Sequence, residues 1–410
     1  MDGSRITREQ ILARLADRVI IMDGAMGTML LQSYSPVSTY SAHNSSNIDY
    51  EGQSTGNTLL KHKTLYCLGD LCISDPERVA QIHRSYIQSG AELIETNTFK
   101  VTAFSGQECR SDKIYELSRC GAEIARKVSE EEALSFMLGD DNILSGDFSA
   151  EIAEDRDAGF DKTYGTEMSL KEDVCSKWKA EWGPRRAIVA GCIGACGQSE
   201  DAFRIQAEGL LDGGADVLLL EGIYDFQIAE NACDAIAEVL KRKGEDIPVM
   251  ASATIDREGR ILSGEDFRTV FGRLEKYGVF SMGFNCSMGA EAMLPFATEL
   301  AEFTCGRESS GSGQLRQPQA NTEVGEDILA KEYPVSICPS AGLPDNEGQY
   351  PEDPEFWASC LQKMISRIER EYSKSVKTDT CVAGKRKGCF AGGCCGTTPD
   401  YIKALKDSCK

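Results

Sequence analysis

Eight short runs of apolar residues recur along the chain, and each is long enough to form one buried strand. They lie at residues 18–26, 91–99, 186–194, 215–223, 247–255, 277–286, 333–342 and 388–396. Near-continuous apolar runs of this length are typical of parallel strands that are covered on both faces. The pattern therefore predicts a parallel sheet of eight strands.

Helical patterns separate these runs. Residues 75–91 begin with Asp75 as the expected N-cap and Pro76 in the first turn, and Gly90 follows as a stop signal. Three more helices are expected at residues 201–215, 265–278 and 354–372. This alternation predicts an α/β fold, a (β/α)8 TIM-type barrel that forms a single domain over residues 8–410. A doubly wound open sheet is the alternative.

Four stretches interrupt the alternation. Their content of Ser, Gly, Gln, Asn and charged residues indicates surface insertions in the barrel. They lie at about 34–60, 130–185, 305–330 and 373–387.

The net charge and the short length of the apolar runs disfavour several classes of binding partner. The 410 residues carry a formal net charge of −21, which disfavours nucleic acid and anionic lipid because both require clustered Lys and Arg. No apolar run reaches the length of a membrane span, and the N-terminus lacks the apolar core of a signal peptide. We therefore expect a cytoplasmic protein without a membrane or nucleic-acid partner.

Cysteine is abundant and histidine is scarce. The chain has 17 cysteines, scattered rather than arranged in a short framework, and 3 histidines. In a cytoplasmic protein most of these cysteines should be free thiols that pack as small apolar side chains. Any metal site in this chain should therefore use sulfur more than imidazole.

The ends of the predicted strands carry the candidate chemistry. Catalytic groups of an α/β barrel gather at the carboxyl ends of its strands. The residues found there are Asp23 for the first run, Glu95 and Asn97 for the second, Glu221 for the fourth, Asn285 and Cys286 for the sixth, and Cys394 and Cys395 for the eighth.

Three of these residues suit a metal. Three Cys ligands with one open position are typical of a catalytic zinc, and Cys286, Cys394 and Cys395 would supply them from two strand ends. Two adjacent cysteines can reach one ion only on a tight, irregular backbone. The flanking glycines permit such a turn; they are Gly392, Gly393 and Gly396.

A helix start follows the paired cysteines. Thr397 or Thr398 can cap a helix whose first turn holds Pro399 and Asp400. The positive end of that helix would then lie near the two sulfurs and favour thiolate over thiol.

Each of these candidates has a simpler interpretation. Among 17 cysteines an adjacent pair can arise by chance, so that the thiols are buried and inert; a disulfide between the two neighbours is disfavoured by its geometry. Asp23 could be only a loop residue, and Glu95 and Glu221 could form ion pairs inside the barrel mouth. The glycines after Asp23 suggest a phosphate loop, but the required Lys is missing.

Seven segments in order resemble the homocysteine S-methyltransferase family, and most closely the homocysteine-binding module of cobalamin-dependent methionine synthase. They are distributed along almost the whole length of the chain, and the four insertions lie outside them. The segments are IMDGAMGTML (21–30), AELIETNTF (91–99), GGADVLLLEGIYD (213–225), SATIDREGRILSGE (252–265), GFNCSMG (283–289), AGLPDNEGQY (341–350) and GGCCGTTPDYI (392–402).

The resemblance implies a (β/α)8 barrel with a Zn²⁺ ion held by three cysteines, which align with Cys286, Cys394 and Cys395. In the family, the zinc binds the sulfur of homocysteine, and acidic groups at the positions of Asp23 and Glu221 recognise its amino end. The full substrate site that we predict consists of Asp23, Glu95, Asn97, Glu221 and Ser340.

The implied reaction is transfer of a methyl group to homocysteine, forming methionine. A free thiol has a pKa of about 8.5, and zinc coordination removes its proton, which is worth roughly 2 kcal/mol at pH 7. The expected donor is S-methylmethionine or S-adenosylmethionine. Methylcobalamin or methyltetrahydrofolate on a cobalamin- or folate-binding partner chain is the next candidate, and a betaine-type donor is another.

Three departures from the family pattern lie near the expected mouth. They are Ala195 in place of Pro, Gly222 in place of Thr, and Ser340 in place of Asn. Because of these departures, two further interpretations are retained: the protein is a non-catalytic paralogue that binds zinc or thiols, or it is a redox sensor. An ordinary barrel enzyme that uses Glu95 and Glu221 as acid and base is a third reading. Extra thiols near the third strand could compete for metal or oxidise; they are Cys192 and Cys196.

Overall fold

The computed structural model describes residues 5–34, 68–101, 111–138, 186–195, 199–305, 333–375 and 388–409. All eight predicted apolar runs contain a strand, and each strand pairs in parallel with its neighbours in the order β1-β8-β7-β6-β5-β4-β3-β2. The strands are β1 (Ile20–Ile21), β2 (Leu93–Glu95), β3 (Ile188–Gly194), β4 (Val217–Ile223), β5 (Val249–Ala253), β6 (Ser281–Gly289), β7 (Val335–Ser340) and β8 (Phe390–Ala391).

The two ends of this sheet meet and form a nearly closed barrel. Met22, just after β1, bridges in parallel to Leu93 of β2. Two backbone hydrogen bonds support the bridge, from Glu92 N to Ile21 O at 2.7 Å and from Asp23 N to Leu93 O at 3.0 Å. The predicted TIM-type barrel is therefore confirmed, and the alternative open sheet is excluded.

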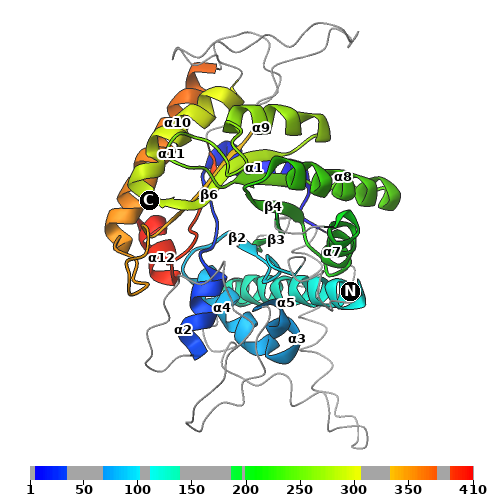
Figure 1. Ribbon diagram of the computed structural model, residues 1–410. Coiled ribbons are helices and arrows are strands. Elements are labelled where there is room, and N and C mark those ends of the chain that lie inside the picture. The colour runs from blue at the N-terminus through cyan, green and yellow to red at the C-terminus, as the bar shows by residue number, and fades with distance from the viewer. Residues whose placement is uncertain are drawn as a thin grey trace, which may run out of the picture.

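Helices surround the barrel (Figure 1). Helices α10, α11 and α12 pack in sequence on one side, while α5, α7 and α8 do so on the other. The described helices are α1 (Arg8–Asp17), α2 (Met26–Tyr34), α3 (Leu71–Ser74), α4 (Pro76–Gln88), α5 (Ser111–Leu138), α7 (Glu200–Asp212), α8 (Phe226–Lys243), α9 (Phe267–Leu274), α10 (Ala290–Thr304), α11 (Pro354–Ser375) and α12 (Pro399–Ser408), with short 3-10 turns η1 (Leu68–Asp70) and η3 (Glu275–Tyr277).

The predicted start and stop signals of α4 are confirmed. Asp75 is its N-cap and accepts a hydrogen bond from Arg78 N, and Pro76 occupies the first helical position. Gly90, just beyond the helix, has a φ of 110°, a conformation that residues with a Cβ rarely adopt.

The barrel has an inner and an outer apolar core. The outer core packs the strands against the helices. The inner core fills the barrel with alternate strand residues such as Leu93, Leu219 and Phe390, and it includes Ile11 and Leu15 of α1. Helix α1 therefore closes the end of the barrel at which the strands begin, and the opposite end is left for a site.

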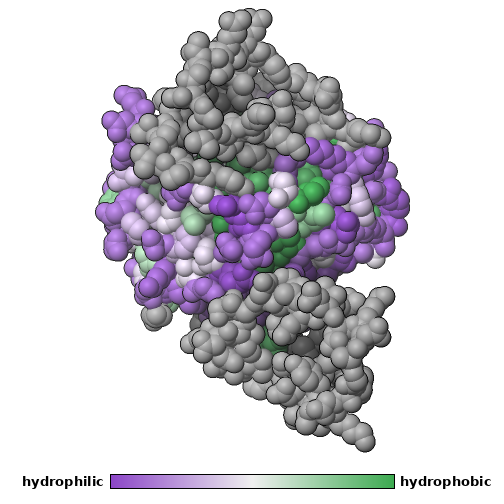
Figure 2. All heavy atoms as spheres, turned by 90° about the horizontal axis from the view of Figure 1, so that it is seen from below, coloured by the Kyte–Doolittle hydropathy of each residue, from purple (hydrophilic) through white to green (hydrophobic). Residues whose placement is uncertain are grey.

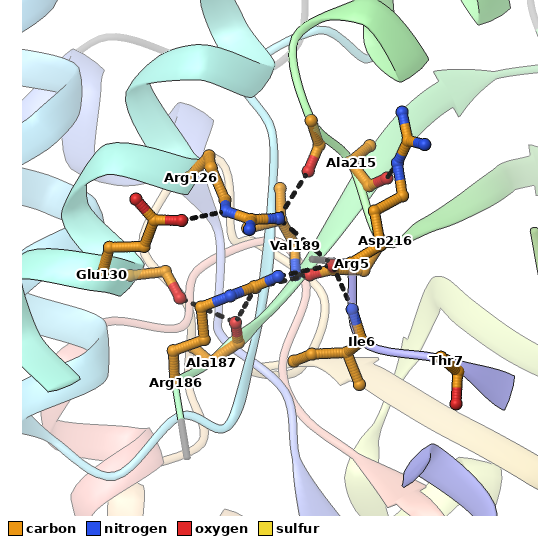
Figure 3. A network of polar contacts seen from close by, with 12 residues as sticks. Arg5, Ile6, Thr7, Arg126, Glu130, Arg186, Ala187, Val189, Ala215 and Asp216 are labelled. Atoms are coloured by element: carbon orange, nitrogen blue, oxygen red, sulfur yellow. Dashed lines mark hydrogen bonds and ion pairs between the residues drawn. The ribbon is translucent and has the colours of Figure 1, made fainter. Parts of the chain in front are cut away.

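A polar network reinforces the closed end (Figure 3). Asp216, just before β4, is fully buried. Arg186 donates to both of its carboxylate oxygens at 2.6 Å, and Ile6 N and Val189 N donate at 2.8 and 2.9 Å. The network joins the N-terminal segment to β3 and β4.

The predicted insertions fall largely outside the described residues. At their edges, residues 130–138 continue α5 and residues 373–375 continue α11. Where the surface is described, Figure 2 shows mainly hydrophilic residues with smaller apolar areas. Among the helices of the described ranges, none has the length and apolar character needed to cross a bilayer, and the cysteines there are free thiols.

Candidate active site

The carboxyl ends of the strands bring the predicted residues to the open end of the barrel. Asp23 follows β1, Glu95 ends β2 and Glu221 lies near the end of β4. Cys286 lies in the second half of β6, and Ser340 ends β7. All five are buried or half-buried, so they line an interior site rather than the outer surface.

Three cysteine sulfurs form the first cluster. The Sγ atoms of Cys286, Cys394 and Cys395 all lie within 4.8 Å of one another, and those of Cys286 and Cys395 are 3.2 Å apart. A tetrahedral zinc with Zn–S bonds of about 2.3 Å separates its sulfurs by ~3.8 Å. The cluster is close to that spacing, and three sulfur ligands leave a fourth position for substrate. The donor set therefore fits a catalytic zinc.

An irregularity in β6 turns Cys286 toward this cluster. The pairing of β6 with β7 shifts register between Asn285 and Gly289. Cys286 and Ser287 have φ angles of 59° and 55°. Non-glycine residues in this left-handed region cost about 1–3 kcal/mol each, and such strain is concentrated at functional sites. The position of the Cys286 sulfur therefore comes with a cost in local backbone stability.

Hydrogen bonds to two neighbouring segments hold the turn that carries the other two cysteines. Cys394 N donates to Pro339 O at 3.0 Å, Ala341 N donates to Cys395 O at 2.9 Å, and Gly393 N donates to Asp23 O at 2.9 Å. Gly396 has a φ of 84°, and the ring of Tyr350 fills the space that a Cβ at this position would need. The predicted tight glycine turn is present.

Helix α12 begins directly after the turn, as the sequence predicts, but the expected side-chain cap is absent. Thr398 occupies the N-cap position without a side-chain capping bond. Thr397 donates its hydroxyl to Cys394 O at 2.7 Å, so this side chain stabilises the cysteine turn instead. The positive end of α12 still follows the two cysteines closely in sequence, where it favours thiolate.

The three thiols of the sulfur cluster shift one another's pKa in different directions. Hydrogen bonds from Cys394 and Cys395 lower the pKa of Cys286. The same contacts with Cys286 raise the pKa of Cys394 and that of Cys395. Ser340 Oγ also donates to Cys286 Sγ at 3.6 Å. These contacts favour the thiolate at Cys286 over the other two, and a metal ion bound by the three sulfurs would require all of them to be deprotonated.

Tyr350 contacts the sulfur cluster, and it is not among the site residues that the sequence predicts. Its hydroxyl forms a hydrogen bond with Cys395, and burial together with the charge of Cys395 raises the pKa of Tyr350. The residue lies at the end of segment 341–350, so the only signal in the sequence was its place in that segment.

Two carboxylates and a thiol form a second cluster. Ligand atoms of Glu95, Cys192 and Glu221 lie within 4.8 Å of one another. Cys192 Sγ donates to Glu221 Oε2 at 3.1 Å, and the carboxyl groups of Glu95 and Glu221 share a hydrogen bond. Burial raises the pKa of Glu221 to about 7. Burial and the charge of Glu221 raise the pKa of Glu95.

Asp23 adds a third carboxylate to this region. Its Oδ2 accepts a hydrogen bond from Glu95 N at 3.0 Å, while its buried Oδ1 has no partner. Burial raises the pKa of Asp23, and the charge of Glu221 adds to that effect. In the described part of the chain, no basic side chain contributes to the pKa of Asp23, Glu95 or Glu221. The region therefore lacks a cation of its own.

Asn285 connects the two clusters, a role that its strand-end position alone did not predict. Its Nδ2 donates to Glu221 Oε1 at 3.0 Å, and its Oδ1 accepts from Gly222 N at 3.2 Å and from Ser252 Oγ at 2.9 Å. Since Cys286 is the next residue, one strand positions both a sulfur of the first cluster and the amide that binds Glu221.

Two further residues clarify the predicted site. Asn97 Nδ2 donates to Leu68 O at 2.8 Å, a partner outside both clusters, so its contact with substrate stays a prediction. Gly222 has a φ of 69°, and a Cβ there would press on the ring of Phe99 at 3.2 Å. This departure from the family pattern therefore has a local cause, because a Thr would be strained in this conformation.

A pocket of about 490 Å³ adjoins the sulfur cluster. Residues 287–289 follow Cys286, and residues 342–343 come shortly after Ser340. Charged side chains and apolar ones share the wall. The lining residues are 256–257, 287–289, 292, 342–343 and 351–352.

A model of the homocysteine S-methyltransferase family matches residues 20–409. The chain belongs to the homocysteine S-methyltransferase family. This membership confirms the resemblance seen in the sequence and shows that the protein is a methyltransferase.

Solved structures support the fold of this methyltransferase. The alignment with the metallated form of the Escherichia coli homocysteine methyltransferase MmuM covers 97% of this chain and 99% of the MmuM chain, with 19% identity and a TM-score of 0.53. The oxidised form covers 95% of each chain, with 18% identity and a TM-score of 0.54. The apo form covers 95% of this chain and 96% of its own, with 18% identity and a TM-score of 0.51.

Proposed function

We propose that this methyltransferase is a zinc-dependent enzyme that methylates the sulfur of homocysteine and forms methionine. The observation that carries the proposal is the arrangement of two different clusters in one barrel mouth. One holds three sulfurs within 4.8 Å of one another, and the other holds buried carboxylates at a similar spacing. Homocysteine has a thiol and an ammonium group, which match these two clusters.

Cys286, Cys394 and Cys395 would hold the ion. When bound, Zn²⁺ supplies a Lewis acid that lowers the pKa of a thiol placed at its open position. Three thiolate ligands donate charge, so that the sulfur of the substrate remains a nucleophile. Ser340 and Tyr350 donate hydrogen bonds to two of the ligand sulfurs, which orients them and moderates their charge.

The carboxylates would bind the substrate's ammonium group. Asp23, Glu95 and Glu221 are buried without a cation, and an ammonium group that enters supplies the missing charge. The proton shared by Glu95 and Glu221 then leaves, because two carboxylates beside a cation ionise more readily. Asn285 holds Glu221 in place. Asn97 and Ala195 stay candidates for shaping the same mouth.

The sulfur of homocysteine attacks the methyl carbon in line. The new S–CH₃ bond forms as the bond from the methyl group to its donor breaks, and the thiol proton passes to solvent. No general base is needed at the methyl carbon. We propose a small sulfonium donor, S-methylmethionine or S-adenosylmethionine, because the pocket beside Ser287 has the volume for a small molecule and its wall includes Asp256 and Glu352 together with apolar side chains.

A donor screen with zinc analysis of the same sample tests this function. The expected result is methionine from homocysteine with at least one donor among S-methylmethionine, S-adenosylmethionine, betaine and methylcobalamin, and about one zinc per active chain. A Cys394→Ser variant should lose the zinc ion of the sulfur cluster and, with it, the activity. Zinc binding without turnover on any donor favours a non-catalytic zinc-binding paralogue. Full activity in Cys394→Ser favours an enzyme that uses Glu95 and Glu221 as acid and base.

The cytoplasmic location and a cobalamin- or folate-binding partner chain stay predictions.

A further inference from the structure

The cluster of Glu95, Cys192 and Glu221 has the composition of a second metal site. The three residues lie on adjacent strands, β2, β3 and β4, whose parallel pairing sets their spacing. Their ligand atoms lie within 4.8 Å of one another. The sulfur triad uses none of these residues.

Protons currently occupy the places where a cation would bind. The thiol of Cys192 donates to Glu221 Oε2 at 3.1 Å, and Glu95 and Glu221 share a hydrogen bond between their carboxyl groups. A divalent ion would release one proton from the thiol and one from the carboxyl pair. The three ligands would then carry three negative charges around one ion.

Asp23 provides an independent indication of a missing ligand. The residue is 2% exposed, and its Oδ1 has no hydrogen-bond partner, although buried carboxylate oxygens are almost always paired. Its other oxygen binds Glu95 N at 3.0 Å, which places this carboxylate next to the cluster. Asp23 therefore adds a buried, unpaired carboxylate oxygen beside the cluster, outside the three-residue group itself.

We propose that Glu95, Cys192 and Glu221 form a second, inhibitory cation site that binds Zn²⁺ or a similar thiophilic divalent ion. The thiolate decides the class of ion. Carboxylates alone favour hard cations such as Mg²⁺ or Ca²⁺, whereas a sulfur ligand selects zinc and related metals. Cys192 is thus the residue that makes this a zinc site.

The inhibition rests on the proposed function, because the same carboxylates would bind the ammonium group of homocysteine. An ion on Glu95 and Glu221 excludes that group, so zinc in excess of the catalytic ion should compete with homocysteine. The first ion activates the enzyme and the second inhibits it.

Zinc stoichiometry tests the site without reference to activity. The metal-free full-length chain is dialysed against buffered Zn²⁺, and the bound metal is measured for wild type, Cys192→Ser, Glu95→Gln and Cys394→Ser. We expect Cys192→Ser and Glu95→Gln each to bind one ion fewer than wild type. Cys394→Ser should also lose one ion, and combining it with Cys192→Ser should remove two.

Cys233→Ser is the matched control, because Cys233 is a buried thiol on α8 outside both clusters. It should bind as much zinc as wild type. Wild-type stoichiometry in both Cys192→Ser and Glu95→Gln overturns the proposal, and circular dichroism verifies that the variants are folded. Since the two substitutions differ in chemistry, failure of one to fold leaves the other decisive.

Kinetics then test the inhibition. With a productive donor, excess Zn²⁺ should raise the apparent KM for homocysteine at least tenfold in wild type while leaving kcat unchanged. Cys192→Ser should resist the same zinc concentrations, and homocysteine chelation affects both proteins equally. Equal inhibition of the two overturns the competitive role. Absence of turnover with every donor would refute the proposed function, and the stoichiometry would still decide whether the second site exists.

Discussion

The two ends of the barrel each bury an aspartate, but only one of these aspartates is fully paired. Asp216, at the closed end, receives two hydrogen bonds of 2.6 Å from Arg186 and two more from backbone nitrogens. Asp23, at the open end, accepts one bond from Glu95 N, and its Oδ1 has no partner. Figure 3 shows how completely the first carboxylate is surrounded.

This difference separates a stabilising network from a binding site. A buried charge is tolerated when it is paired and hydrogen-bonded, and it is costly otherwise. Asp216 has its cation inside the protein, so nothing remains for a ligand to supply. Asp23, Glu95 and Glu221 depend on a cation from outside. The open end is therefore less stable than it could be, and that deficit becomes binding energy for a cationic ligand.

The same substitution at the two ends should have different effects on stability. Asp216→Asn removes the charge that Arg186 faces, and a buried guanidinium left unpaired should lower the free energy of unfolding by about 3 kcal/mol. Urea denaturation of the zinc-free protein measures the loss. Asp23→Asn keeps an oxygen for Glu95 N while it removes an unpaired charge, so it should change stability little or increase it. Equal losses at both ends would contradict the comparison.

Asp23→Asn should instead impair substrate binding. Loss of a charged partner for the ammonium group should raise the KM for homocysteine about 10- to 100-fold, since hydrogen bonds to charged groups contribute about 1.5–3 kcal/mol. Steady-state kinetics with a productive donor measure this. A thiol without an amino group, such as 4-mercaptobutyrate, is the control substrate and should be affected much less. A similar loss for both thiols would argue against recognition of the ammonium group.

The pH dependence of stability provides a third distinction. Burial raises the pKa of Glu221 to about 7, so the folded protein keeps a proton that the unfolded chain loses near pH 4.5. The folded state binds more protons, and stability falls as pH rises between those values. The free energy of unfolding of zinc-free wild type, relative to Glu221→Gln, should therefore fall by roughly 2–3 kcal/mol from pH 5 to pH 8.

The comparison with Glu221→Gln removes an opposing contribution. Burial lowers the pKa of His83 to about 3, so this residue contributes stability that is lost as pH falls from about 6.5 toward 3. It does so equally in both proteins. Urea titrations at several pH values supply the difference, and a difference that does not vary with pH would show that Glu221 does not hold its proton in the folded state.

The sequence could predict what depends on local patterns. Apolar runs located all eight strands, and the strand-end rule placed Asp23, Glu95 and Glu221 at one mouth. The adjacent cysteines with their glycines indicated a tight turn, which is present. The strand-end rule also placed Cys286 with the paired cysteines as the third sulfur, and the structure brings it within 4.8 Å of the other two.

Contacts between distant segments could not be predicted in this way. Cys286 has a left-handed backbone conformation, which is normally predicted from a glycine, and this position has none. The register shift in β6 depends on its pairing with β7. The pairing of Asp216 with Arg186 requires the closed barrel. Helices α5 and α8 were not singled out, although α8 has a well-formed amphipathic pattern with Asp225 as its N-cap. Tyr350 contacts the sulfur cluster only because its loop folds over Gly396.

Tyr350 offers the smallest and most local test of the open end. Its hydroxyl donates to a ligand sulfur, Cys395, so Tyr350→Phe should weaken zinc binding about 3- to 10-fold, the value of one hydrogen bond of about 0.5–1.5 kcal/mol. Competition with a chromophoric chelator measures the affinity. Tyr115→Phe is the control, because it removes a hydroxyl that binds Asp212 far from the sulfurs. Unchanged zinc affinity in Tyr350→Phe would mean that the Tyr350 hydroxyl does not stabilise the bound metal, in contrast to the groups that pair with Asp216.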